Sequence, residues 1–159
     1  MLHCVSLGQT TNTKSATLVF THQSGFYQNS FILDVSANDS SLRIHYTTNG
    51  SVPTYIDSVF THPILISNQS ENENTLSDIS TSERWEEPKE LVCKGNIIRA
   101  MAFQDTTPVS TVYSKTYFVE NKTKYSFPIV SIITDSLNLF QEDSGIYIIG
   151  NNNNYSKRG

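Results

Sequence analysis

The feature of this sequence that most constrains its fold is a set of short segments in which apolar and polar residues alternate. In the segment that begins at Leu42, apolar side chains recur at Ile44 and Tyr46. A period of two places successive side chains on opposite faces of a strand. We therefore expect these three residues to face a core, and Arg43 and His45 to face outward.

Other segments of the same kind predict further strands at residues 16–20, 31–35, 63–66, 97–103 and 111–119. Asn49-Gly50 directly follows the strand that starts at Leu42, and this pair suits the positive φ angles of a tight hairpin turn. Short strands separated by turns in this way are typical of a two-sheet antiparallel sandwich. The sequence thus predicts an all-β domain over residues 15–120.

The composition supports this class and excludes others. The chain contains 21 Ser, 17 Thr and 14 Asn, whereas hydrophobic residues make up 37% and charged residues 16%. Aromatic and β-branched residues recur in apolar runs, which disfavours disorder. The net charge of −4 disfavours a nucleic-acid partner. No stretch approaches the roughly 20 apolar residues of a transmembrane helix.

The predicted core follows from the same alternation. Residues on the apolar face of each strand should be buried together, although the register of Ile98 against Ile97 is open. The expected core residues are Leu18, Phe20, Phe31, Leu33, Val35, Leu42, Ile44, Tyr46, Ile98, Ala100, Ala102, Val112 and Tyr117.

The alternation fails in a long polar insertion at residues 67–91, which contains the single Trp of the chain. A connection of this length is a functional loop or a surface insertion. An exposed Trp85 could stack on a sugar ring and serve as a ligand contact. Alternatively, Trp85 and Pro88 fold back and cover the edge of the sandwich.

The two ends of the chain differ from the predicted sandwich. Residues 1–14 are interpreted as a leader remnant or a disordered N-terminus. Residues 127–133 form a continuous apolar run typical of a strand buried on both faces, and Asp135-Ser136 could cap a helical turn through Leu137 and Phe140. Residues 145–150 form another apolar run. We expect a strand, a short helix and a strand, as a linker and the incomplete start of a second domain over residues 121–159.

Candidate catalytic and metal-binding residues do not form a recognisable motif. The histidines His3, His22, His45 and His62 are far apart, and none has a second ligand type at metal spacing. The adjacent acidic pairs Glu86-Glu87 and Glu142-Asp143 are interpreted as solvated charge. We therefore expect no catalytic residue, no metal and no cofactor.

The two cysteines lie far apart in the sequence. Cys93, near the start of a predicted strand, is interpreted as a small, half-buried apolar residue. A bridge between Cys93 and Cys4 would tie the presumed leader to a strand, and we do not expect it.

A resemblance to a known family rests on residues 46–54, YTTNGSVPT. They resemble the Y-T-T-D-G-S-x-P-T signature of the chitobiase/β-hexosaminidase C-terminal-type domain, also described as a fibronectin III-associated module with an immunoglobulin-like sandwich. Residues 24–27 (SGFY), 98–103 and 116–118 extend the match. Asn49 replaces the usual Asp, and both residue types tolerate the left-handed region. The matching residues are Tyr46, Thr47, Thr48, Asn49, Gly50, Ser51, Pro53 and Thr54.

A second resemblance concerns residues 127–152, FPIVSIITDSLNLFQEDSGIYIIGNN. This stretch looks like the start of the conserved region in secreted CotH (spore coat protein H) kinase-like proteins. The insertion, at residues 74–79 and 85–88, also resembles those multidomain proteins. The nucleotide- and metal-binding residues of that family have no matching positions in this chain.

The two resemblances imply a noncatalytic accessory module of a larger secreted, bacterial CotH-like protein, with a positioning or interaction role. Its partners would be the adjacent domain and a cell-surface glycan or protein. The alternative is a carbohydrate-associated module of a chitobiase or β-N-acetylhexosaminidase-like glycosidase. Because this scaffold is widely reused, the fold alone cannot decide between them.

Overall fold

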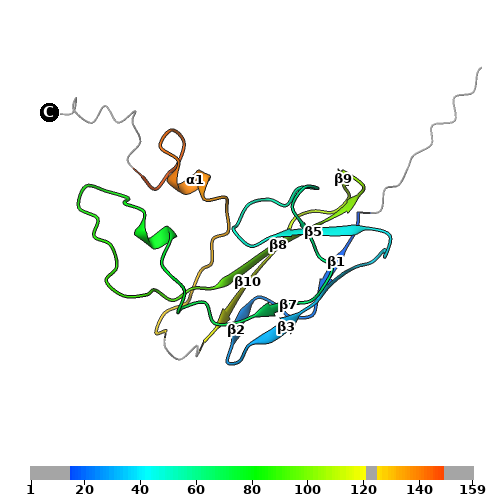
Figure 1. The fold of residues 1–159 in the computed structure, drawn as a ribbon, viewed down its shortest axis with the longest axis horizontal. Coiled ribbons are helices and arrows are strands. Elements are labelled where there is room, and N and C mark those ends of the chain that lie inside the picture. Colours follow the sequence, from blue (N-terminus) through cyan, green and yellow to red (C-terminus); the bar gives the residue numbers. More distant parts are fainter. Residues whose placement is uncertain (1–14, 121–124, 149–159) are drawn as a thin grey trace, which may run out of the picture.

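The computed structural model describes residues 15–120 and 125–148, and the predicted alternating segments form two facing layers of strands (Figure 1). In the smaller layer, β1 (Leu18–Phe20) pairs with β4 (Val35–Ala37), and β3 (Phe31–Leu33) pairs with β7 (Ile64–Ile66). The larger layer has the order β2-β10-β8-β5-β6, with β9 paired to β8. Its strands are β2 (Gly25–Tyr27), β5 (Arg43–Thr47), β6 (Ser58–Val59), β8 (Asn96–Gln104), β9 (Thr107–Pro108) and β10 (Tyr113–Val119).

The strand predicted at residues 31–35 is interrupted at Asp34 and continues as a second strand, so its prediction as one strand was wrong. The Asp34 N–H donates to Thr21 Oγ1 (2.9 Å), and the Thr21 N–H donates to the Asp34 carbonyl (3.0 Å). Thr21 therefore satisfies backbone groups that the break removes from the sheet. The break lets β3 pair with β7 while β4 pairs with β1.

The N-terminal segment crosses from the smaller to the larger layer. After β1 it continues as β2, which runs parallel to β10, with Gly25 opposite Tyr117. The Tyr117 hydroxyl donates to the His22 carbonyl (3.1 Å), and the Thr116 N–H donates to Ser24 Oγ (3.2 Å). The sandwich is therefore antiparallel apart from this one pair, which ties the two layers together at one edge.

The core between the layers confirms most of the predicted residues. Phe31, Leu42 and Tyr46 are half-buried and pack against it, and Val112 is half-buried outside it because β10 begins at Tyr113. Ile98 faces the core and is 2% exposed, which settles its register. The fully confirmed core residues are Leu18, Phe20, Leu33, Val35, Ile44, Ile98, Ala100, Ala102 and Tyr117, and the sequence prediction missed Ala16, Ile66 and Val119.

The outer face of the larger layer is also covered at one end. His45, predicted to face outward into solvent, is 4% exposed and contacts Phe103 edge-on, with ring centroids 5.0 Å apart. Met101 and Phe103 are buried on the same face. The expected exposure of His45 was wrong because the loop after β5 folds over this face, with Pro53 buried in it.

The insertion contains no strand; its residues 67–91 are all described, and its one regular element is the 3-10 turn η1 (Leu76–Asp78). In Figure 1 it projects away from the sandwich (green). Asn74 holds it to the chain that leads into β8, because its amide donates to the Glu90 carbonyl and accepts from the Val92 N–H, both at 3.1 Å.

The tail, defined here as residues 125–148, follows the prediction only in its centre. The helical turn is present as α1 (Leu137–Phe140), and Asp135 Oδ1 accepts the Leu137 N–H at 2.9 Å. The strand predicted at residues 127–133 is absent, and Phe127 and Val130 are more than 80% exposed. Residues 145–148 form no strand, and the rest of that predicted strand lies outside the described residues. Neither run pairs with a strand among the described residues, so apolar character alone does not make them strands.

None of the helices in the described ranges combines the length and the apolar character needed to cross a bilayer.

Candidate functional site

The loop after β5 carries the motif that the sequence analysis singled out, and we call residues 48–57 the motif loop. The Thr47 hydroxyl donates to the Ser51 carbonyl (2.6 Å). Asn49 Oδ1 accepts both the Ser51 N–H (3.0 Å) and the Ser51 hydroxyl (2.7 Å). Asn and Asp side chains favour such local turns, since they can bond to backbone two residues ahead. These polar side chains thus shape the first half of the loop.

A second set of hydrogen bonds closes the loop. Asp57 Oδ2 accepts the Thr54 N–H and the Thr54 hydroxyl, each at 2.7 Å. Together these bonds hold the pKa of Asp57 below its ordinary value of 3.8, and the bond from the Thr54 hydroxyl has the larger effect. Burial acts in the opposite direction. The Asp57 carbonyl lies 2.9 Å from His45 Nδ1, so the loop also binds the buried face of β5.

Gly50 is buried at the bend of the motif loop and has a φ of +88°, which confirms the predicted positive angle. Its carbonyl accepts from Arg99 Nη1 at 2.7 Å. A Cβ at this position would lie 2.5 Å from the Thr134 carbonyl oxygen of the tail. The expected tight hairpin turn was wrong, however: β5 pairs with β6, and all of residues 48–57 lie between them.

The remaining motif side chains have simple surroundings. Tyr46 is half-buried, and its ring lies edge-on to Phe60 at 6.1 Å between centroids. Pro53 is fully buried, whereas Thr48 is exposed. Most of the motif side chains therefore stabilise the loop, while Thr48 and Asn49 are exposed.

A cleft of about 550 Å³ lies beside these two residues. Three separate parts of the chain form it: the motif loop, the insertion with the segment that follows it, and the start of α1 in the tail. Hydroxyl groups line its rim, and its only charged group, the Lys94 ammonium, already donates to the Asn72 and Val92 carbonyls. The lining residues are Thr48, Asn49, Thr75, Leu76, Ser77, Val92, Lys94, Gly95, Ile97 and Ser136.

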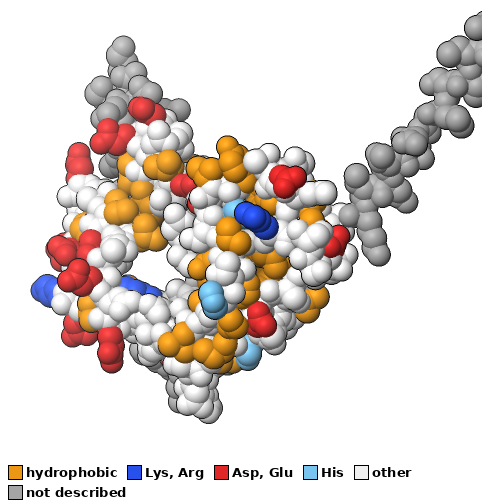
Figure 2. All heavy atoms as spheres, turned by 45° about the vertical axis from the view of Figure 1, so that its right-hand side comes forward, with side chains coloured by type: hydrophobic (Ala, Val, Ile, Leu, Met, Phe, Trp, Pro, Cys, Tyr) orange, Lys and Arg blue, Asp and Glu red, His pale blue; other side chains and the backbone are white. Residues whose placement is uncertain are grey.

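Acidic residues gather on the insertion, which Figure 2 shows as a red side of the molecule separated by an opening from the sandwich. The insertion contains seven of the 15 acidic residues of the chain and two basic ones. None of these acidic side chains lines the cleft, whose charged lining residue is Lys94. The acidic residues are Glu71, Glu73, Asp78, Glu83, Glu86, Glu87 and Glu90.

Trp85, the predicted ligand contact, is half-buried in the insertion and is not part of the cleft lining. Its backbone N–H donates to the Ser82 carbonyl at 3.1 Å. The structure thus does not bring Trp85 together with the motif residues, and its role as a contact stays a prediction.

A larger cavity of about 650 Å³ lies between β9 and the start of β1. Asp39 is its one charged lining residue, and its carboxylate accepts the Ser41 N–H (2.9 Å) and hydroxyl (2.7 Å). These bonds lower the pKa of Asp39. The carboxylate is therefore occupied by a local turn.

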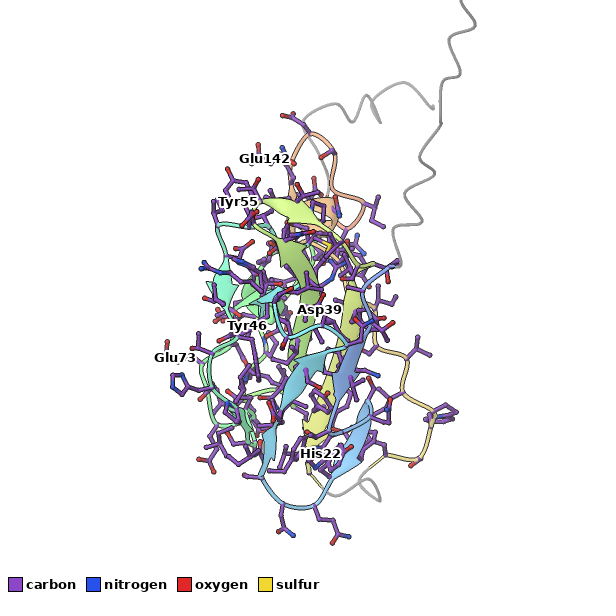
Figure 3. All side chains as sticks on the ribbon, turned by 90° about the vertical axis from the view of Figure 1, so that its right-hand side faces the viewer. His22, Asp39, Tyr46, Tyr55, Glu73 and Glu142 are labelled. Atoms are coloured by element: carbon purple, nitrogen blue, oxygen red, sulfur yellow. The ribbon has the colours of Figure 1, made fainter. Side chains whose placement is uncertain are left out.

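One small group of titratable side chains, Tyr125, Glu120 and Cys93, comes together in the described part of the chain. Across residues 15–120 and 125–148, no group of three His, Cys, Asp or Glu side chains is arranged to hold a metal ion. His22, Glu73 and Glu142 lie well apart in Figure 3. The pairs Glu86-Glu87 and Glu142-Asp143 are exposed, as predicted.

The histidines and the cysteines have separate surroundings. His22 stacks on Phe31 at 4.1 Å between centroids, and Thr61 Oγ1 lies 2.9 Å from Nδ1 of the exposed His62. Cys93, expected to be half-buried, is exposed because β8 starts only at Asn96. Cys4 and His3 lie outside the described residues.

These features define a class: an immunoglobulin-like β-sandwich whose characteristic loop is held by its own hydrogen bonds. The family model described as Fn3 associated matches residues 33–117, from the end of β3 into β10 and through the motif loop. The chain belongs to this Fn3-associated family. No curated protein and no solved structure matches the chain significantly.

Proposed function

We propose that this Fn3-associated domain is a noncatalytic accessory module of a larger CotH-like protein, where it positions a neighbouring domain. The observation that carries the proposal is the use of the motif side chains. Thr47, Asn49 and Ser51 bond to one another, and Thr54 bonds to Asp57. Polar groups that hold a loop in this way are not available to bind a reacting group.

Two chemical requirements also favour a noncatalytic role. Phosphoryl transfer needs a phosphate cradle and metal-holding carboxylates in one site. Glycoside hydrolysis needs two carboxyl groups about 5–9.5 Å apart across a pocket. The cleft beside Thr48 offers hydroxyls and a single ammonium that is already hydrogen-bonded.

We further propose that the parent protein is secreted or belongs to the cell envelope of a bacterium. This rests on the resemblance of the tail and the insertion to secreted CotH-like proteins. In that setting its partners are the adjacent domain and a cell-surface glycan or protein, and the module carries no cofactor.

Assays of the purified chain test the noncatalytic role. ATP turnover with Mg²⁺ or Mn²⁺, and release of a reporter from an N-acetylglucosaminide, should both stay at the buffer background. Reproducible turnover that one carboxylate substitution abolishes, such as Asp57→Asn or Glu87→Gln, would overturn the proposal.

The second candidate is a carbohydrate-associated module of a chitobiase or β-N-acetylhexosaminidase-like glycosidase. The cleft favours it, because a lining that combines hydroxyl groups with the apolar side chains of Leu76, Val92 and Ile97 suits a neutral sugar. The half-buried Trp85 is a separate candidate contact.

A glycan array followed by titration with chito-oligosaccharides distinguishes the two candidates. Loss of binding in Trp85→Ala would place the ligand on the insertion. Loss in Ser77→Trp, which fills the cleft, but not in Trp85→Ala, would place it in the cleft. If neither array nor titration detects a glycan, the carbohydrate-associated role is wrong.

A further inference from the structure

On the outer face of the larger layer, a strand residue makes a polar contact with the tail rather than with another strand. Along β10, Tyr117 faces the core, so its neighbour Thr116 faces outward. Thr116 is nevertheless only 6% exposed, and its hydroxyl lies 2.9 Å from the hydroxyl of Ser131 in the tail. The tail therefore covers the outer face of β10.

A second contact lies on the motif loop. The close approach between the Gly50 α-carbon and the Thr134 carbonyl leaves no room for a side chain at position 50. Beyond this point the Asn138 amide donates to Thr134 Oγ1 (2.8 Å). The backbone at Thr134 is thus held between the motif loop and α1.

A third contact holds the near end of the tail. The Tyr125 ring lies 5.6 Å from that of Phe26, which stacks on Phe118 of β10 at 4.9 Å. The Tyr125 hydroxyl also donates to Glu120. Figure 1 shows the tail (orange) running from this end of the sheet past the sandwich to α1.

We infer that the outer faces of β2 and β10, together with Gly50, form a docking seat for residues 125–136 of the same chain. The seat makes the tail and the sandwich one rigid body, so a domain carried by the tail keeps a set orientation. This inference rests on the proposed positioning role and supplies its physical means. Glycine is then required at position 50 for two reasons: the positive φ, and the close contact with the tail.

Exposure along the tail falls toward its contact with the motif loop. Val130 and Ile132 are about four-fifths exposed and Ser131 is exposed, whereas Ile133 and Thr134 are half-buried. The tail therefore lies closest to the seat at Ile133 and Thr134, and Ser131 contacts the seat through its hydroxyl.

Disulfide trapping in the full chain tests the seat, with Cys4 and Cys93 replaced by Ser. The pair Thr116→Cys and Ser131→Cys replaces two hydroxyls in contact, so the thiols come near the spacing that a disulfide needs. The matched control joins Ser131→Cys to Ser114→Cys, which lies on the same face of β10 two residues away. Mild oxidation should crosslink the first pair much faster, as followed by peptide mass spectrometry. Equal rates would overturn the inference.

A second measurement keeps the test independent of those substitutions. Gly50→Asn retains a residue that tolerates positive φ but adds a Cβ against Thr134. Chymotrypsin should then cut the tail after the half-buried Tyr125 or Phe140 faster than in the unaltered chain, while Thr48→Asn in the same loop leaves the rate unchanged. An unchanged rate in Gly50→Asn would overturn the inference.

The two proposals fail separately. Enzymatic turnover by the chain would overturn the noncatalytic role and leave the crosslinking result intact. Equal crosslinking of the two cysteine pairs would overturn the docking seat and leave the noncatalytic role standing.

Discussion

Gly50 is the residue on which the motif loop depends most directly. Its φ of +88° disfavours a β-branched side chain, and any Cβ would lie 2.5 Å from the Thr134 carbonyl. Gly50→Val should therefore lower the free energy of unfolding by about 2 kcal/mol or more, through backbone strain and displacement of the tail. Urea denaturation followed by tyrosine fluorescence measures this loss.

Thr48→Val is the matched control, because Thr48 is exposed in the same loop. It should change the free energy of unfolding by less than about 0.5 kcal/mol. Equal effects of the two substitutions would show that Gly50 is not specifically required.

Ile44 tests the placement of the core. It is 7% exposed at the centre of the larger layer, opposite Ala102 of β8. Ile44→Ala should lower the free energy of unfolding by about 2–5 kcal/mol, the usual loss for a buried Ile. Ile32→Ala, at a site 55% exposed, serves as the control and should cost far less. A loss below about 0.5 kcal/mol for Ile44→Ala would contradict the assignment.

Asp57 should make stability depend on pH at the acidic end. Its pKa in the folded state lies below the ordinary value of 3.8, because the carboxylate accepts two hydrogen bonds from Thr54. A depressed pKa stabilises the fold above that ordinary value, and the contribution is lost as the pH falls through the folded-state pKa. Thermal unfolding from neutral pH into the acid range should show a smaller decline for Asp57→Asn than for the unaltered chain.

Thr54→Val provides the comparison for this pH effect. It removes the hydroxyl donor but leaves the carboxylate and the backbone donor, so it should reduce the decline only in part. Parallel acid profiles in all three proteins would rule out the role given to Asp57.

Among the elements, the interrupted strand β3/β4 shows how a side chain can permit a break in a sheet. The hydrogen bonds between Thr21 and Asp34 replace those that a continuous ladder would make. Thr21→Val keeps the shape of the side chain but removes its oxygen. It should lower the free energy of unfolding by about 0.5–1.5 kcal/mol, the net value of a typical hydrogen bond.

The same substitution at Thr17, which is exposed next to Leu18, is the control for Thr21→Val. Its backbone N–H bonds to Asn38, and Val preserves that bond. If chemical denaturation gives equal values for the two variants, Thr21 does not support the break.

At the scale of the whole molecule, the tail leaves apolar side chains exposed on its free side. Ile129 is 40% exposed, and Ile132 and Ile146 are about 80% exposed. The tail therefore folds onto the sandwich only in part, and exposed apolar surface of this kind drives association. Analytical ultracentrifugation should show concentration-dependent self-association of the chain.

Ile132→Asp combined with Ile146→Asp should weaken this self-association without lowering the melting temperature of the sandwich. Ile32→Asp on the outer face of β3, 55% exposed, is the control and should leave association unchanged. A chain that stays monomeric at all concentrations would contradict the prediction.

The sequence by itself determined the class of fold and most of the core. Alternation at Leu18, Leu33 and Ile44 and the positive φ of Gly50 follow from local rules: a strand repeats every two residues, and only some residues accept a left-handed backbone. Such rules need only neighbouring residues. They therefore also predicted the helical turn at Leu137–Phe140.

The tertiary structure alone decided which faces are covered and which strands pair. His45 is buried because the motif loop folds over it, with the Asp57 carbonyl at its ring, and β2 pairs with β10 across some ninety residues of chain. Within residues 125–148 the apolar runs of the tail pair with no strand and are irregular. Burial and pairing depend on contacts between residues distant in the sequence, and no local pattern specifies the partner.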